Sequence, residues 1–141
     1  RLYEHMTGQK VRVSGFLRHA ELYAGCSLDG HIGDFEEVVE VKCPQPATHW
    51  EYLRTGTVPT DYYWQCIHAL WMTGARHCDW MSYHPEFPEK LRAKLVCIHR
   101  DEKAIADYDA KVRKFLTDVE SEYQAVMTMH DVAGVLKASV V

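Results

Sequence analysis

Residues 27–42 read SLDGHIGDFEEVVEVK and determine how the rest of the chain is arranged. The last five of them, residues 38–42, are rich in β-branched valine and predict a strand. Side chains alternate between the two faces of a strand, so Glu40 and Lys42 emerge on one face and Val41 points to the other. An acid and an amine therefore share one side of this strand.

Asp29 is the second acid of this stretch that we expect to matter. Gly30 and Gly33 predict a turn between Asp29 and the strand, and such a turn folds Asp29 back beside Glu40. Two carboxylates that meet at one point form a hard oxygen site for a divalent cation such as Mg²⁺. Lys42 beside them can orient or help to deprotonate a water, or offset negative charge in a phosphorane-like transition state.

The order acid, spacer, Glu-x-Lys resembles the pattern of the PD-(D/E)xK nucleases. An exposed strand also carries alternating Glu and Lys as a solvated face, and the three residues alone favour that plainer interpretation. The nuclease interpretation therefore depends on the rest of the chain.

Length and composition predict one soluble globular domain. The 141 residues suffice for one core, which we place at residues 1–129, with a loose tail at 130–141. No run of 18 or more apolar residues and no signal peptide is visible, so we expect a cytoplasmic protein without a membrane partner. Residues 1–7 look like the end of a helix stopped by Gly8, which indicates that the domain is incomplete at its N-terminus.

Cysteine and histidine usage predicts reduced thiols rather than disulfides or zinc. The five cysteines form no Cys-x-x-Cys pair, and the nine histidines have no regular ligand spacing. The nearest approach to a zinc set is His77-Cys78 with His49, which is a poor candidate. A zinc-structural domain therefore stays a minor alternative.

The formal charge of −4 argues against DNA binding by the whole surface, but it is compatible with a basic groove. Arg12 and Arg18 are candidates to face a phosphate, and a solvated surface role is equally compatible with their positions. Composition therefore neither supports nor excludes binding to nucleic acid.

The remaining elements predict an α/β protein, more closely an α+β mixed sheet flanked by helices. The predicted strands and helices are strands 24–28, 35–42, 77–84 and 94–99, and helices 47–54, 60–73 and a long one after Asp101. Gln65 lies in the aromatic helix 60–73, where we expect it to be buried. It either makes a structural hydrogen bond or reaches a metal-bound water or a phosphate.

Three ordered motifs resemble the phage lambda exonuclease family, the YqaJ-like viral recombinase nucleases. They are SLDG at 27–30, EVKCP at 40–44 and YWQCIHALWMT at 63–73. Residues 83–85 and 100–103 also look like that family, and the resemblance covers roughly residues 1–125. It implies a restriction-endonuclease-like PD-(D/E)xK core.

The resemblance also implies an activity and partners. The chain would be a Mg²⁺-dependent exonuclease, with Mn²⁺ as a substitute, that digests the 5′-ended strand of linear double-stranded DNA. The 3′ overhang would pass to a phage single-strand annealing protein. Family members form homotrimeric rings around DNA, and the gene would be carried by a phage or prophage in a bacterial host cell.

Matching positions carry the implied roles. Asp29 and Glu40 would be metal ligands with the Val41 carbonyl as a third, and Lys42 would position or activate the attacking water. Gln65 matches a glutamine near that site, and Ser27 matches a serine near the terminal 5′-phosphate.

One departure from the family concerns an upstream helix that supplies a further acid to the metal site. This chain begins after that position, and Glu4 aligns one or two helical turns too late to replace the acid. The alternatives are a related endonuclease or RecB-type repair nuclease, and a catalytically inactive DNA-binding or assembly module.

Overall fold

The computed structural model describes the backbone of residues 1–138 and the side chains of residues 1–130. Backbone contacts divide the chain into two units, Arg1–Tyr108 and Asp109–Val141, and each is described by itself. The predicted boundaries of a core at 1–129 and a tail at 130–141 stay a prediction, because that tail lies almost entirely outside the residues whose side chains are described.

A four-stranded mixed sheet forms the centre of the first unit. Its strands in spatial order are β3 (Gly30–Ile32), β4 (Glu37–Lys42), β5 (His77–Tyr83) and β6 (Ala93–His99). The pair β4–β5 is parallel, whereas β3–β4 and β5–β6 are antiparallel. The predicted mixed sheet is confirmed.

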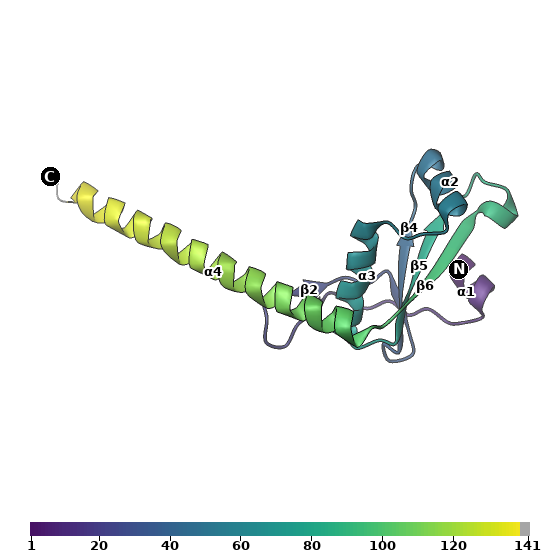
Figure 1. Cartoon of the computed structure of the whole chain (residues 1–141), viewed down its shortest axis with the longest axis horizontal. Helices are drawn as coiled ribbons and strands as arrows, with labels where there is room; N and C mark the ends of the chain where they lie inside the picture. Colours follow the sequence, from purple (N-terminus) through teal and green to yellow (C-terminus); the bar gives the residue numbers. More distant parts are fainter. Residues whose placement is uncertain (139–141) are drawn as a thin grey trace. The chain divides into compact units, whose positions relative to one another are not determined.

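Helices cover both faces of this sheet. The chain returns from β4 to its parallel neighbour β5 through two helices, as a parallel connection requires. These are α2 (Pro46–Thr55) and α3 (Thr60–Thr73), which lie on one side of the sheet, while α1 (Leu2–Thr7) lies on the other (Figure 1). The smaller elements are β1 (Leu17–Arg18) paired with β2 (Gly25–Cys26), and a 3-10 turn η1 (Glu89–Leu91).

The predicted turn between Asp29 and β4 is present and contains Gly33, but Gly30 is not part of it. Gly30 lies inside β3, paired with Val39, and the chain reverses at residues 33–36. Gly33 and Phe35 adopt positive φ angles of 58° and 64° there. Gly30 is required for a different reason, because a Cβ at this position would lie 2.4 Å from the Val11 side chain.

Each face of the sheet has its own apolar core. On the face covered by α3, Val38 and Trp80 pack with Ile67 and Leu70 of that helix. On the opposite face, Tyr3 of α1 packs against Val39 and Met81 of the sheet. These two cores hold β4 between them, with alternate side chains in each.

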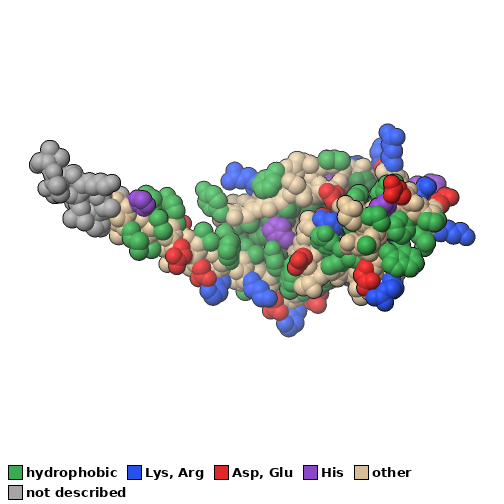
Figure 2. Space-filling view, turned by 90° about the horizontal axis from the view of Figure 1, so that it is seen from above, with side chains coloured by type: hydrophobic (Ala, Val, Ile, Leu, Met, Phe, Trp, Pro, Cys, Tyr) green, Lys and Arg blue, Asp and Glu red, His purple; other side chains and the backbone are tan. Residues whose placement is uncertain are grey.

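Helix α4 (Glu102–Ala138) begins as the sequence predicts, because Asp101 Oδ1 accepts the backbone N–H groups of Lys103 (2.8 Å) and Ala104. Apolar residues recur every three or four positions along this helix, but over most of its length they are not buried in a core. In the second unit these apolar side chains are largely exposed: Phe115 has a relative exposure of 64%, and Val119, Tyr123 and Val126 are also exposed. In the space-filling view, hydrophobic and charged side chains alternate along this helix (Figure 2). Across the described residues, no helix has the length and apolar character needed to span a bilayer.

Candidate active site

The site begins with two side chains on the α3 face of β4. Glu40 pairs in register with Trp80 and Lys42 with Ser82, so both project from the same face of the sheet, as the alternation predicts. Lys42 Nζ donates a hydrogen bond to a carboxylate oxygen of Glu40, and the same ammonium lies 4.9 Å from the centre of the Tyr62 ring. Glu40 is only 5% exposed. The lysine is therefore held at a buried carboxylate.

Burial raises the pKa of the Glu40 carboxyl above its ordinary value. The contact with Lys42 lowers this pKa, and the negative charge of Asp29 raises it again. Desolvation is the larger effect, so the ionised form of Glu40 is disfavoured until positive charge is added. A cation between the two carboxylates is what this electrostatic arrangement favours.

Asp29 lies beside Glu40 at the edge of the sheet. Gly30 pairs with Val39 in the antiparallel register, which places Asp29 opposite Glu40 one step further on. Asp29 Oδ2 accepts the backbone N–H of Val41 at 2.8 Å. Because the N–H and C=O of one strand residue point to the same edge, the Val41 carbonyl also faces the side where Asp29 lies.

The donors that the fold brings together are hard oxygens. Two carboxylates and a backbone carbonyl are ligands that Mg²⁺ and Mn²⁺ accept, and no thiolate or imidazole is needed. The residues Asp29, Glu40 and Val41 therefore fit the metal that the sequence predicts. Their roles as ligands stay a prediction.

Glu4 of α1 shares a pocket with Asp29, and neither Glu40 nor Lys42 lines that pocket. It lines a pocket of about 470 Å³ together with Asp29, Val41 and Tyr83. Its Oε1 also accepts the backbone N–H of Val11 at 3.1 Å, so part of its hydrogen-bonding capacity is used to hold the loop after α1. Glu4 is thus near Asp29 in space although the two are far apart in sequence.

Gln65 and Ser27 are both exposed. The expectation that Gln65 is buried is wrong, because the buried stripe of α3 is formed by its neighbours, Cys66 and Ile67 among them. An exposed amide needs no internal partner and is free to contact a ligand. Ser27 stands between β2 and Asp29 on the segment that leads into the site.

The two arginines that we expect to contact phosphate are exposed and lie on the strands leading to Asp29. Arg12 forms a backbone bridge with His31 of β3, and Arg18 pairs with Gly25 in the small sheet. In the part of the chain that the structure describes, neither guanidinium forms a salt bridge. Both charges are available to an anion.

Two neighbours of the site were missed at the sequence level. Tyr62 supplies the ring beneath Lys42, and Cys26 lies close enough to Glu40 for that carboxylate to contribute, after burial, to a raised thiol pKa. Tyr62 is one of several aromatic residues in helix 60–73, and periodicity alone does not distinguish it from Tyr63. Only packing selects it.

Comparison with known proteins supports the family that the sequence motifs resemble. The YqaJ-like viral recombinase domain matches residues 1–76. A crystal structure of an alkaline exonuclease from Laribacter hongkongensis is similar, with a TM-score of 0.88 and 30% sequence identity over 94% of this chain and 68% of that one. A second structure of that enzyme, in complex with dAMP, gives the same values.

A phage-related exonuclease from Haemophilus somnus 129PT has a TM-score of 0.58 at 12% identity, over 86% of this chain and 67% of that one, and shows the fold alone. No curated protein matches the sequence. The fold class and the enzyme class predicted from the sequence, a nuclease, are confirmed. The chain belongs to the YqaJ-like viral recombinase family.

Proposed function

We propose that this chain is a Mg²⁺-dependent exodeoxyribonuclease that digests the 5′-ended strand of linear double-stranded DNA. The observation that carries the proposal is the meeting of Asp29, Glu40 and the Val41 backbone, with the Lys42 ammonium at the same carboxylate. Membership of the family supports nuclease activity. The hard oxygen donors support Mg²⁺ as the bound metal, with Mn²⁺ as a substitute.

The residues of the site have distinct roles in this proposal. Asp29, Glu40 and the Val41 carbonyl hold the metal, which when bound polarises the scissile phosphate and makes a bound water more acidic. The Lys42 ammonium orients the attacking water and offsets the charge that develops on the phosphate oxygens. Tyr62 limits the positions that this ammonium can adopt.

Contacts with DNA come from exposed residues around the site. In this proposal Ser27 donates to a terminal 5′-phosphate, and Arg12 and Arg18 hold the DNA backbone. Their exposure supports this, as does the absence of a salt bridge to either guanidinium among the described residues. Gln65 contacts the water or a phosphate from α3. The formal charge of the chain is −4, so in this proposal the contact with the DNA backbone depends on these local positive charges.

The assembly and the biological setting rest on the resemblance. We propose a homotrimer in the cytoplasm of a bacterial host, encoded by a phage or prophage, that hands its 3′ overhang to a single-strand annealing protein. The exposed apolar side chains of the second unit support self-association.

The test uses linear duplex DNA labelled at either the 5′ or the 3′ end of one strand, with Mg²⁺ or with EDTA. We expect Mg²⁺-dependent loss of the 5′-ended strand and a fall of about 100-fold or more in Lys42→Ala, a typical cost of losing one charge-stabilising group. Lys90→Ala, which removes an exposed amine on η1, is the matched control. Digestion by Lys42→Ala at the parental rate would contradict the assigned role.

The alternatives give different results in the same assay. A related endonuclease also cuts covalently closed circular DNA, whereas an exonuclease requires an end. An inactive binding module cuts neither substrate and shows no stabilisation by Mg²⁺.

A further inference from the structure

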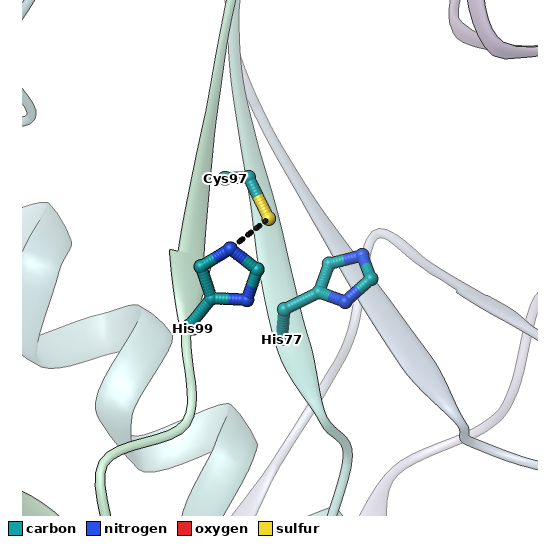
Figure 3. Close-up of side chains that lie close together, drawn as sticks. All are labelled: His77, Cys97 and His99. Atoms are coloured by element: carbon teal, nitrogen blue, oxygen red, sulfur yellow. Dashed lines mark hydrogen bonds between the residues drawn. The ribbon is translucent and has the colours of Figure 1, made fainter.

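A second cluster of metal-ligating side chains lies at the opposite end of β4 from Lys42. Glu37 begins β4, His77 begins β5 and His99 ends β6, and the strand registers align them in one row. The next row on the same face contains Asp79 and Cys97, because side chains two residues apart share a face. Figure 3 shows Cys97 and His99 on β6 beside His77 on the neighbouring strand.

The distances within this cluster suit a small tetrahedral ion. One ligand atom each from His77, Cys97 and His99 lies within 4.8 Å of the other two. Cys97 Sγ and His99 Nε2 are 3.8 Å apart, and His77 Nε2 is 3.7 Å from Asp79 Oδ1. Zinc bonds of about 2.0–2.3 Å place neighbouring tetrahedral ligands roughly 3.3–3.6 Å apart, so the ligand atoms of His77, Cys97 and His99 must draw together on binding. The carboxylate of Asp79 lies outside the set within 4.8 Å and must move toward it to become the fourth ligand.

Buried negative charge adjoins the cluster. Asp79 is 6% exposed, and its other oxygen, Oδ2, accepts a 2.7 Å hydrogen bond from the Tyr3 hydroxyl, which fixes the direction of Oδ1. Glu37 Oε1 pairs with Arg76, but Glu37 Oε2 is buried without a hydrogen bond and lies 3.4 Å from His77 Nε2.

The geometry points to a site for Zn²⁺ or a similar borderline-soft divalent ion, held by His77, Cys97, His99 and Asp79 Oδ1. One sulfur, two imidazole nitrogens and one carboxylate oxygen form a closed four-ligand set of the structural kind. The Cys97 thiol gives its proton to solvent when the ion binds. The Tyr3–Asp79 hydrogen bond orients the carboxylate from behind.

This site differs in chemistry from the oxygen site at Asp29 and Glu40, so the proposal does not rest on the proposed function. Sulfur and imidazole ligands select zinc over magnesium. A bound ion would tie β5 to β6, the two strands that supply all four ligands, at the end of the sheet remote from Lys42. We infer a stabilising site, separate from the reaction.

The test is a Co²⁺ titration of the reduced chain in excess Mg²⁺, which saturates the oxygen site. Co²⁺ replaces Zn²⁺ and reports a cysteine ligand by a thiolate-to-cobalt charge-transfer band. We expect one equivalent of Co²⁺ to produce this band, and Zn²⁺ to abolish it. Cys97→Ser should remove the band, whereas Cys43→Ser, at another exposed cysteine, should retain it.

His99→Gln provides a second variant, in which the thiol is intact, and we expect Co²⁺ affinity to fall by about tenfold or more. Circular dichroism of each variant establishes that it is folded, and Zn²⁺ should raise the melting temperature of the parental chain by more than that of His99→Gln at the same Zn²⁺ concentration. The absence of a charge-transfer band, or a band that persists in folded Cys97→Ser, would overturn the proposal. So would parental affinity in His99→Gln.

Discussion

At the scale of single residues, Glu40 places a negative charge where the fold provides little solvent, and the exposed Asp29 adds a second negative charge nearby. Glu40 is buried against Trp80 and keeps one ammonium partner, Lys42. An ionised carboxylate in this buried position lowers the stability of the folded chain when no metal ion is bound. Two substitutions measure this effect separately from catalysis.

Glu40→Gln should stabilise the metal-free chain at neutral pH by about 1 kcal/mol, the usual gain when a functional charge is removed. The pKa of Glu40 is raised in the folded state from its ordinary value of 4.5, so the unfolded chain loses this proton first as pH rises. The unfolding free energy of the parental chain therefore falls as the pH rises from 4.5 to the raised pKa of Glu40. At higher pH it stays lower by the same amount. Urea denaturation of the parental chain and of Glu40→Gln, in EDTA and at several pH values, tests this. Equal unfolding free energies of the two chains at neutral pH would contradict the prediction.

Asp29→Asn should remove most of the stabilisation that Mg²⁺ gives the parental chain. An amide can still accept the Val41 N–H, so the loop is kept while the charge that binds the cation is lost. Thermal melting with increasing Mg²⁺ measures the effect. Asp34→Asn, an exposed acid in the turn of the same hairpin, is the control and should respond to Mg²⁺ as the parental chain does.

At the scale of elements, the site depends on the hairpin of β3 and β4 and on the loop that crosses it. Val11 lies against the backbone of Gly30, where a Cβ has no room, and Arg12 continues the contact by bridging to His31. Gly30 therefore sets how close this loop comes to Asp29. The sequence indicated a turn glycine here because glycine most often serves that purpose, whereas a close approach is visible only in three dimensions.

Gly30→Ala should destabilise the chain by about 1–3 kcal/mol, because the new methyl group would overlap the Val11 side chain. Val11→Ala in the same chain removes that overlap and should recover part of the loss. A double-mutant cycle of unfolding free energies measures the coupling between the two positions. Additive effects would show that the two side chains do not interfere.

At the scale of the whole molecule, the part of α4 that belongs to the second unit carries an exposed apolar stripe. Phe115, Val119 and Tyr123 recur at helical spacing and remain exposed. The periodicity of apolar residues shows which of them share a face of the helix but not what they pack against. An exposed stripe of this kind is the usual mark of an interface.

Phe115→Ser combined with Val119→Ser should weaken self-association and leave the melting temperature of the core nearly unchanged. Sedimentation or light scattering over a range of concentrations measures the mass. Thr117→Asn is the control, since two residues turn the helix by about 200° and place Thr117 opposite Phe115. A parental chain that remains monomeric at all concentrations would refute the proposed homotrimer.

The sequence by itself determined the elements and part of the site. Helix 60–73 was predicted with the bounds that α3 has, because an apolar stripe and a following Gly74 are local signals. The shared face of Glu40 and Lys42 was also predictable, since alternation along a strand needs no knowledge of neighbouring strands. Gln65 was misplaced as a buried residue because a helix rich in aromatic residues on several sides does not show which side faces the core.

Only the tertiary structure decided which distant residues meet. The bond from Val41 to Asp29, the ring of Tyr62 beneath Lys42 and the place of Glu4 depend on pairing and packing between elements. Adjacent residues such as His77 and Cys78 point to opposite faces of β5, whereas Cys97 joins His77 because β5 and β6 pair in a particular register. That register is set by the cores on the two faces of the sheet, which no single segment of the sequence contains.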